Sequence, residues 1–303
     1  MERQFLNLCR KGDLKEVKKL LKKYPYINIS VNADIFCCVC IDGHLELAKW
    51  LYSLKPDINT EILFIWVCGN GHLEVAKWLH QINPDINNYT DYNTAFVSAC
   101  YNGHLEVAQW LLRVKPDINI SDNNELVFRN ACIDGNLKLA QWLLNVKPDI
   151  DISVENEYVF YNACLKDHLA IAKWLLNVKP DINISINNEY VFCEICKYGR
   201  LEVAQWLLNV KPDINISINN EELFCWACKY GRLEIAKWLQ SLKPWLYVIE
   251  YDLDGFYAGY KIRTKEEIIW EKRKYTLHLA LQEKTNILYH LPKDIAKAVT
   301  LFV

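Results

Sequence analysis

The chain has 303 residues, about half of them apolar, and it carries 35 basic and 37 acidic side chains, which give a formal net charge of −2. A charge so close to zero provides no long-range attraction to nucleic acid or to an anionic membrane, and we expect neither as a partner. The first residues contain no apolar signal core, and no stretch reaches the roughly 18 uninterrupted apolar residues of a membrane span. We therefore expect the twelve cysteines to be free thiols in a reducing cytosol or nucleus, and we predict a cytoplasmic location.

A repeat of 32 residues organises most of the chain. Tryptophan recurs seven times between Trp50 and Trp238, with one step of 28 residues followed by five steps of 32. Proline and cysteine each recur eight times in the same register. Three residue types that share one period indicate eight structural repeats, which occupy residues 1–244.

One repeat, taken from residue 124 onwards, predicts two short helices. The first helix has an apolar stripe at the spacing i, i+3 and i+4, formed by Phe128, Ala131 and Cys132. The second helix should bury Leu137, Ala140, Leu143 and Leu144. Gly135 ends the first helix and Pro148 ends the second. Residues 150–156 should then cross to the next repeat as an extended loop or a hairpin.

Two helices this short cannot bury their apolar faces alone. Stacking against the neighbouring pairs makes the apolar core continuous. The periodicity therefore predicts an all-α solenoid of helix-turn-helix pairs, with a tryptophan filling a large volume in each pair.

The repeat resembles the ankyrin repeat. The sequence Gly-His-Leu-Glu recurs at 43–46, 71–74 and 103–106, followed by an alanine, a Trp-Leu pair and Lys-Pro-Asp-Ile-Asn, with asparagine in place of the lysine in the repeat that contains 71–74. Two features depart from the family pattern. The usual Thr-Pro start is replaced by runs such as residues 188–192, and Lys-Pro-Asp stands in place of Gly-Ala-Asp. This tryptophan-rich form is similar to the ankyrin repeat proteins of giant, mimivirus-like DNA viruses.

The resemblance implies an ankyrin-repeat solenoid in which hairpin loops join the helix pairs. It also implies a monomeric, non-catalytic scaffold that binds another protein on the concave face, formed by the hairpin tips and the exposed side of the first helices. The positions that vary between repeats on that face are Trp66, Tyr101, Glu194, Lys197, Tyr198, Trp226, Lys229 and Tyr230. The pairs 197–198 and 229–230 predict a partner patch of acidic and apolar character. Alternatively, some of these aromatic residues pack against a neighbouring hairpin.

Three Cys-x-x-Cys pairs, at 37 and 40, 193 and 196, and 225 and 228, have the spacing of zinc or redox sites. A thiol- or zinc-dependent protein is therefore the alternative from the enzyme class. However, the second cysteine of each pair is the core position of the repeat, which favours a structural role.

The histidines at 44, 72, 104 and 168 share one position beside the turn, which Asn136, Arg200 and Arg232 occupy in other repeats. This exchange favours a hydrogen-bonding role over a set of metal ligands. The sequence contains no phosphate-binding glycine loop, no HExxH and no serine elbow. We therefore expect no enzyme activity, metal or cofactor.

Residues 245–303 leave the repeat register and are expected to form a mainly helical cap. Two strand-like runs around Asp254-Gly255 predict a hairpin. Residues 264–267 then form a capping box that opens a helix through Trp270 and Tyr275.

The tail, residues 287–303, resembles the start of an F-box or the F-box-like motif of poxviral ankyrin proteins. The resemblance implies recruitment of a ubiquitin-ligase adaptor subunit of the host. The residues that match the motif or form its apolar stripe are Leu291, Pro292, Ile295 and Val299.

Overall fold

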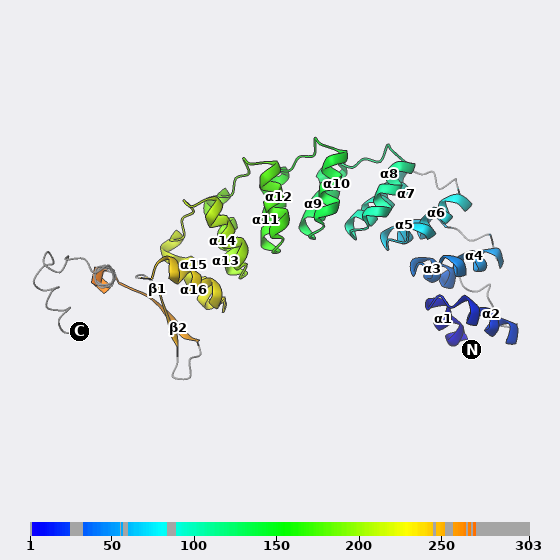
Figure 1. Cartoon of the computed structure of the whole chain (residues 1–303), viewed down its shortest axis with the longest axis horizontal. Helices are drawn as coiled ribbons and strands as arrows, with labels where there is room; N and C mark the ends of the chain where they lie inside the picture. The colour runs from blue at the N-terminus through cyan, green and yellow to red at the C-terminus, as the bar shows by residue number, and fades with distance from the viewer. Residues whose placement is uncertain are drawn as a thin grey trace, which may run out of the picture. The chain divides into compact units, whose positions relative to one another are not determined.

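A computed structural model describes residues 2–24, 33–54, 56, 60–83, 89–244, 247–251, 257–264, 266–267 and 269–270 (Figure 1). Sixteen helices and two strands lie within these residues. Their bounds are α1 Glu2–Arg10, α2 Leu14–Lys23, α3 Ala33–Ile41, α4 Leu45–Leu54, α5 Glu61–Gly69, α6 Leu73–Ile82, α7 Tyr89–Tyr101, α8 Leu105–Val114, α9 Asp122–Ile133, α10 Leu137–Val146, α11 Val154–Leu165, α12 Leu169–Val178, α13 Ile186–Lys197, α14 Leu201–Val210, α15 Ile218–Lys229, α16 Leu233–Leu242, β1 Tyr247–Tyr251 and β2 Tyr257–Ile262. None of the described helices has both the length and the apolar character needed to cross a bilayer.

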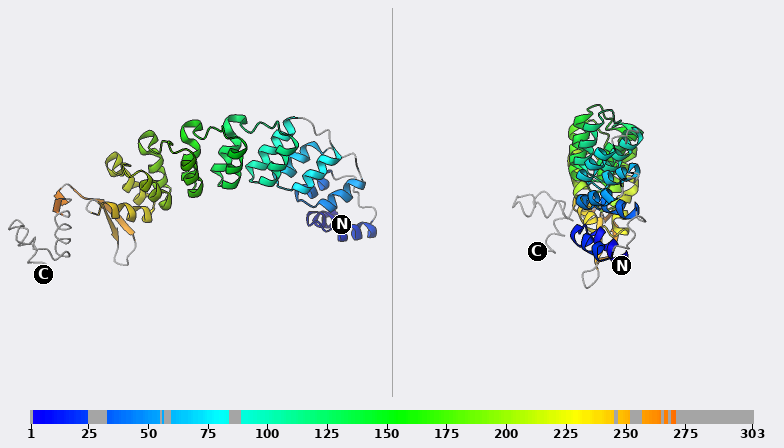
Figure 2. Two further views of the ribbon diagram at one scale, coloured as in Figure 1. Left: turned by 45° about the horizontal axis from the view of Figure 1, so that its top comes forward. Right: turned by 90° about the vertical axis from the view of Figure 1, so that its right-hand side faces the viewer.

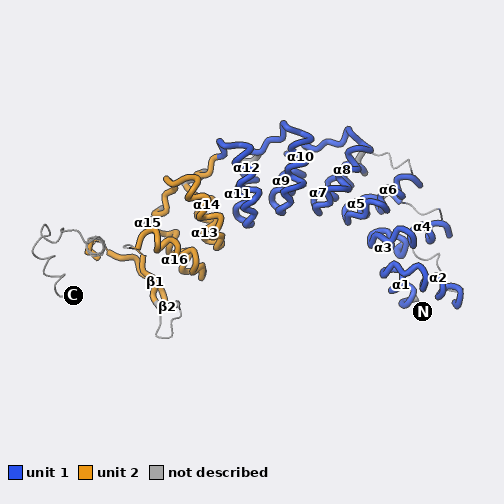
Figure 3. The backbone as a smooth tube through the Cα atoms, viewed as in Figure 1, with its two compact units in different colours: residues 1–182 blue, residues 183–303 orange. Residues whose placement is uncertain are grey.

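The chain forms two compact units, residues 1–182 and residues 183–303 (Figure 3). The first unit holds α1 to α12, and the second holds α13 to α16 with β1 and β2. Within each unit the helices form consecutive pairs, and each first helix lies beside the first helix of the next pair (Figure 2). The predicted boundary after residue 244 rests on the loss of the repeat register and stays a prediction.

The pair α9 and α10 explains how one repeat folds. Val127, Phe128, Ala131 and Cys132 of α9 are buried, which confirms the predicted apolar stripe. The buried residues of α10 are Leu139, Ala140 and Leu143. Leu137 and Leu144, which the sequence predicted to be buried, are only half-buried. The face of α10 that packs inward is therefore centred on Leu139, Ala140 and Leu143.

The turn between the two helices of this pair depends on Gly135. Its φ of 85° lies in the left-handed region, where a side chain would be strained. The next residue, Asn136, donates its backbone N–H to the carbonyl of Ala131 at 2.8 Å, which closes the end of α9. A Cβ at Gly135 would also lie 2.8 Å from the ring of His168, which belongs to the following pair, α11 and α12. Glycine is therefore required both by the backbone and by the neighbouring repeat.

The linkers differ from the predicted extended loops or hairpins. Ile150 and Ile152 are buried, and α11 already begins at Val154, inside the predicted loop. The hydroxyl of Ser153 donates to the carboxylate of Glu157 at 2.9 Å, and Glu157 has a φ of 61°. This contact tightens the entry to the first helix, so the described linkers contain turns and no strand.

Aromatic side chains join consecutive pairs. The phenylalanine of one first helix faces the tryptophan of the second helix in the next pair, with ring centroids 6.2–6.4 Å apart. The pairs are Phe36–Trp78, Phe64–Trp110, Phe96–Trp142, Phe128–Trp174 and Phe192–Trp238. These five tryptophans therefore pack across the boundary between two repeats.

The strands β1 and β2 pair antiparallel after α16, which confirms the predicted hairpin strands. Tyr247 is fully buried and stacks on Phe224 with ring centroids 4.2 Å apart. Next, the backbone N–H of Thr264 donates to Glu267 at 2.8 Å, and the N–H of Glu267 donates to the Thr264 hydroxyl at 3.3 Å. This reciprocal pair confirms the capping box, whereas Tyr275 lies outside the described residues.

Candidate protein-binding surface

The second unit presents aromatic and basic side chains at the ends of its two first helices. Lys197 ends α13 and Lys229 ends α15, and a tyrosine follows each. Tyr198 is 47% exposed and Tyr230 is 48% exposed. Trp226 lies one turn before Tyr230 and is half-buried. The residues that the sequence predicted as a cluster therefore occupy matching positions on adjacent helices.

Lys197 holds this cluster together. Its Nζ lies 5.9 Å from the centre of the Tyr198 ring and 5.8 Å from that of Trp226. The same atom lies 3.0 Å from a carboxylate oxygen of Glu194, and this hydrogen bond is the main reason that the pKa of Lys197 is raised. The guanidinium Nε of Arg232 donates to the backbone carbonyl of Lys197 at 3.1 Å. We call Glu194, Lys197, Tyr198, Trp226 and Tyr230 the Lys197 cluster.

Glu194 differs from the predicted exposure. Only 9% of this residue is exposed, because it sits one helical turn before Lys197 and pairs with it. Its carboxylate therefore positions Lys197 and offers little surface of its own to a partner. No pattern in the sequence indicates this burial, since tryptophan holds the same position in other repeats, at Trp66 and Trp226.

The first unit carries a separate exposed patch on α5 and α7. Trp66 is 51% exposed and Tyr101 is 59% exposed. Ile62, which sequence reasoning missed, is also exposed and lies four residues before Trp66, on the same face of α5. The i, i+4 spacing of two large apolar residues was the signal that could have identified it.

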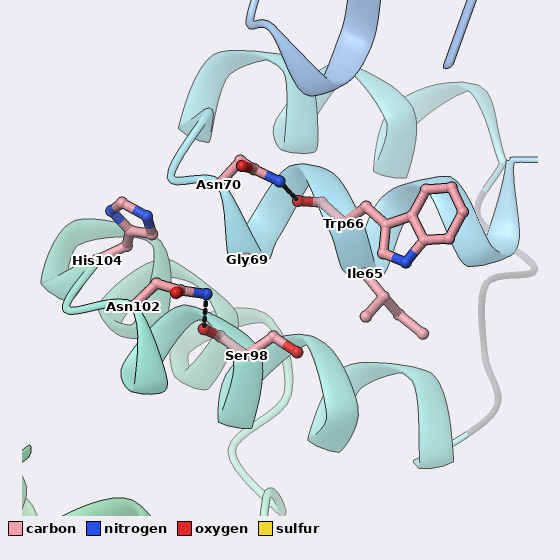
Figure 4. A pocket seen from close by; sticks show the side chains of 7 residues that line it. All are labelled: Ile65, Trp66, Gly69, Asn70, Ser98, Asn102 and His104. Atoms are coloured by element: carbon pink, nitrogen blue, oxygen red, sulfur yellow. Dashed lines mark hydrogen bonds between the residues drawn. The ribbon is translucent and has the colours of Figure 1, made fainter. Parts of the chain in front are cut away.

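A hollow of about 360 Å³ lies between α5 and α7, beside Trp66 (Figure 4). Its lining consists of Ile65, Trp66, Gly69, Asn70, Ser98, Asn102 and His104. Other repeats have a side chain at the position of Gly69, such as Tyr101 or Lys197, so the glycine helps to open this space.

The hydrogen bonds of the hollow orient two amides. The side-chain nitrogen of Asn70 donates to the carbonyl of Trp66 at 2.8 Å, and that of Asn102 donates to the carbonyl of Ser98 at 3.0 Å (Figure 4). Because each amide nitrogen is used in this way, each amide oxygen is left as an acceptor. The hollow therefore suits a side chain that combines an apolar stem with hydrogen-bond donors.

The Cys-x-x-Cys pairs are built into the helices. Cys40, Cys196 and Cys228 are buried, which confirms the core position of the second cysteine. Burial raises the pKa of the Cys40 and Cys196 thiols well above the usual value, and it raises that of Cys193 to about 11. Among the described residues, no group of three or more histidine, cysteine and acidic side chains could hold a metal ion. A buried thiol with a raised pKa is a poor nucleophile.

The residues beside the turns make hydrogen bonds to the preceding pair. The Nε2 of His44 lies 2.8 Å from the carbonyl of Arg10, and Arg232 bonds Lys197 in the same way. Burial lowers the pKa of His72, although a hydrogen bond with the backbone of Ile41 opposes this shift. The predicted hydrogen-bonding role is therefore confirmed at His44 and Arg232.

The predicted ligase-recruiting residues Leu291, Pro292, Ile295 and Val299 lie outside the described residues.

Stacked helix pairs with short turns define a helical repeat protein. The family model described as "Ankyrin repeats (3 copies)" matches residues 35–124, 63–156 and 160–244, which together exceed half of the chain. The chain therefore belongs to the ankyrin repeat family. Ankyrin repeats are a general protein-protein interaction module, and proteins built from them are generally non-catalytic.

Among solved structures, the chain is similar to an ankyrin repeat family protein from Legionella pneumophila. The two are 20% identical, with a TM-score of 0.42, and the match covers 68% of this chain and 77% of the other. No curated protein matches the chain in sequence. The similarity to proteins of giant viruses stays a prediction from the sequence.

Proposed function

We propose that the protein is a non-catalytic, monomeric scaffold of the cytoplasm that binds a target protein through the exposed ends of its first helices. The observation that carries this proposal is the Lys197 cluster, in which the lysine lies against Tyr198 and Trp226 on adjacent helices and Tyr230 is half-exposed one turn after Trp226. Aromatic side chains held in this way lose little conformational entropy on binding and are frequent hot spots.

The cluster favours a target patch of acidic and apolar character. Lys197, Lys229 and Arg232 supply positive charge, and the tyrosine rings supply apolar area with a polar edge. In the first unit, Ile62 and Trp66 offer apolar area beside the hollow, which suits a donor-bearing side chain of the target. Each unit thus has a binding patch with its own chemistry.

Site-specific crosslinking tests this function. A photoreactive phenylalanine derivative placed at Tyr230 should capture a target in extracts of the native cell, and the crosslinked peptide should contain acidic residues. The same group at Val210, which is also exposed but ends a second helix, is the matched control. The double variant Trp226→Ala, Tyr230→Ala should lose the target, whereas Val178→Ala with Val210→Ala should keep it. Equal capture from both positions would contradict the proposal.

The sequence motif of residues 287–303 supports a second role, recruitment of a ubiquitin-ligase adaptor subunit. Deletion of residues 288–303 should abolish co-purification of that adaptor while leaving capture at Tyr230 unchanged. Loss of both interactions, or retention of the adaptor, would argue against a separate tail function.

A further inference from the structure

The near-neutral net charge of the chain conceals an uneven distribution. Residues 2–24 carry eight basic and three acidic side chains, a net charge of +5. The whole chain has a net charge of −2, so the other residues together carry −7. The basic side chains of residues 2–24 are all exposed. The first helix pair is therefore a local cationic surface on an otherwise acidic chain.

Most of this charge lies on one face of α2. Lysine occupies positions 15, 18, 19, 22 and 23, which follow the spacing i, i+3, i+4, i+7 and i+8 of a single helical face. We call these five residues the lysine stripe. The opposite face packs inward through Val17 and Leu20, which are buried. The helix thus places its apolar residues in the core and presents two turns of ammonium groups outward.

The other second helices do not share this feature. On α4, α6 and α16 the exposed lysine pairs with a glutamate three residues earlier, at 2.7–3.2 Å. On α2 only the Lys19–Glu16 pair follows that pattern, at 3.4 Å, and Lys15 stands where α4 has Glu46. The repeat itself therefore does not account for the lysine stripe.

We propose that the lysine stripe binds an anionic phospholipid surface. A row of exposed lysines on an amphipathic helix matches the phosphate and carboxylate groups of acidic headgroups, and each lysine near such a surface strengthens binding about fivefold. Because Val17 and Leu20 are committed to the core, binding is peripheral and electrostatic, without insertion. The other residues together carry a net negative charge, so they add no net attraction to the same surface.

The chemistry of the stripe favours lipid over a protein or a nucleic acid. The centres of protein interfaces are depleted in lysine and enriched in tryptophan, tyrosine and arginine, none of which occurs in the stripe. Binding of single-stranded nucleic acid relies on exposed aromatic rings for base stacking. The rings beside the stripe are Trp50, 5.5 Å from the Nζ of Lys18, and Tyr24, 5.3 Å from the Nζ of Lys23, and both are half-buried. Headgroups need only the charge that the stripe supplies. The proposal is independent of the protein-binding function, which rests on the first helices.

Co-sedimentation of the full chain with vesicles tests the proposal. The chain should sediment with mixed vesicles that contain phosphatidylcholine and phosphatidylserine in a one-to-one ratio. It should not sediment with vesicles of phosphatidylcholine alone. Raising the ionic strength from about 0.1 M to about 1 M shortens the Debye length from about 10 Å to about 3 Å and should release the chain.

Charge variants locate the contact. The triple variant Lys15→Gln, Lys22→Gln, Lys23→Gln should bind the acidic vesicles about a hundredfold more weakly. The triple arginine variant at the same positions should bind normally. A matched control, Lys49→Gln, Lys77→Gln, Lys237→Gln, removes the same charge from other second helices and should also bind normally.

Three outcomes overturn the proposal. These are undiminished binding by the glutamine variant of α2, equal weakening by the control variant, and tighter binding to a DNA duplex than to the vesicles. Circular dichroism of each variant should match that of the parent chain, because the substituted residues are exposed except Lys77, whose side chain is 37% exposed.

Discussion

The first and the last helix pairs among the described residues differ in the aromatic contact that joins neighbouring repeats. In the first pair, Lys19 stands where the second helices of the other seven pairs carry tryptophan, and its side chain is 74% exposed. In the last pair, Phe224 stacks on Tyr247 of β1 instead of meeting the tryptophan of a further repeat. In the first pair a lysine thus occupies the tryptophan position, and in the last pair the hairpin of β1 and β2 covers the phenylalanine.

The difference shows that the tryptophan serves the boundary between repeats. Where a phenylalanine precedes it, the ring covers that phenylalanine, as Trp78 covers Phe36. On α2, before which the structure describes no helix pair, a lysine takes the position. We infer that β1 and β2 act as a cap, because Tyr247 supplies the cover that a further repeat would give to Phe224.

The largest expected loss of stability comes from removing one of the tryptophans that pack against a phenylalanine of the preceding repeat. Trp110→Ala removes the most deeply buried of the repeat tryptophans, which faces Phe64, and should lower the free energy of unfolding by about 3–5 kcal/mol. Urea unfolding followed by circular dichroism measures this loss. Lys19→Ala, at the matching position of α2, should change stability by less than about 0.5 kcal/mol. Similar losses in both variants would show that the position matters within each repeat and not between repeats.

Breaking the hairpin contact should have the next largest effect. Tyr247→Ala uncovers Phe224 and removes the hydroxyl that donates to Glu221, with an expected loss of about 3 kcal/mol. Tyr247→Phe keeps the stacked ring and should lose only about 1–2 kcal/mol. Hydrogen exchange should report faster opening of α15 and α16 in the alanine variant. Unchanged exchange there would refute the capping role.

Alanine substitutions at two turn glycines, Gly135 and Gly231, should cause a smaller loss of stability and can be compared with each other. Gly135→Ala forces a side chain into the left-handed region and against His168, and should cost about 2–3 kcal/mol. Gly231→Ala meets the same backbone strain, but no atom lies within 4 Å of its Cβ, so the cost should be about 1 kcal/mol. Thermal unfolding distinguishes the two. In the double variant Gly135→Ala, His168→Ala, the loss of stability should fall to that of Gly135→Ala without the clash, which is close to that of Gly231→Ala. If the loss stays as large as in Gly135→Ala alone, the strain of the backbone accounts for it and the contact with His168 does not.

The smallest effect concerns the capping box after the hairpin. Hydrogen bonds from Lys261 and from Thr264 lower the pKa of Glu267 from 4.5 to about 2. Because the folded-state pKa is depressed, the contribution of this carboxylate is complete above pH 4.5 and is lost as the pH falls towards 2. Nuclear magnetic resonance titration of the Glu267 carboxyl should find the low midpoint, and Lys261→Gln should raise it. A midpoint near 4.5 in the parent chain would contradict the described contacts.

Much of the fold could be predicted because the same residue types recur at the same positions in each repeat and mark the helical faces and the helix ends. The spacing of Phe128, Ala131 and Cys132 identified a helical face, and Gly135 identified its end. The start of α11 was missed, since it depends on a contact between Ser153 and Glu157 that no periodic pattern reveals. The division after residue 182 was missed as well, because the register continues through it without interruption.

The candidate site was predictable only in part. The positions of Tyr198 and Tyr230 within the repeat were enough to predict that they are exposed, because the end of a helix beside a turn faces outward. The burial of Glu194 depends on its ion pair with Lys197, and the hollow depends on Ser98 lying opposite Gly69. Such features arise from contacts between repeats, which a pattern within one repeat does not specify.

Hydrogen exchange of the chain with and without its captured target tests the central claim most directly. The target should slow exchange at the ends of α13 and α15, including the backbone amides of Tyr198 and Tyr230, and should leave exchange in α14 and α16 unchanged. Protection confined to α14 and α16, with none at the two tyrosines, would contradict the assignment of the first-helix ends as the binding surface.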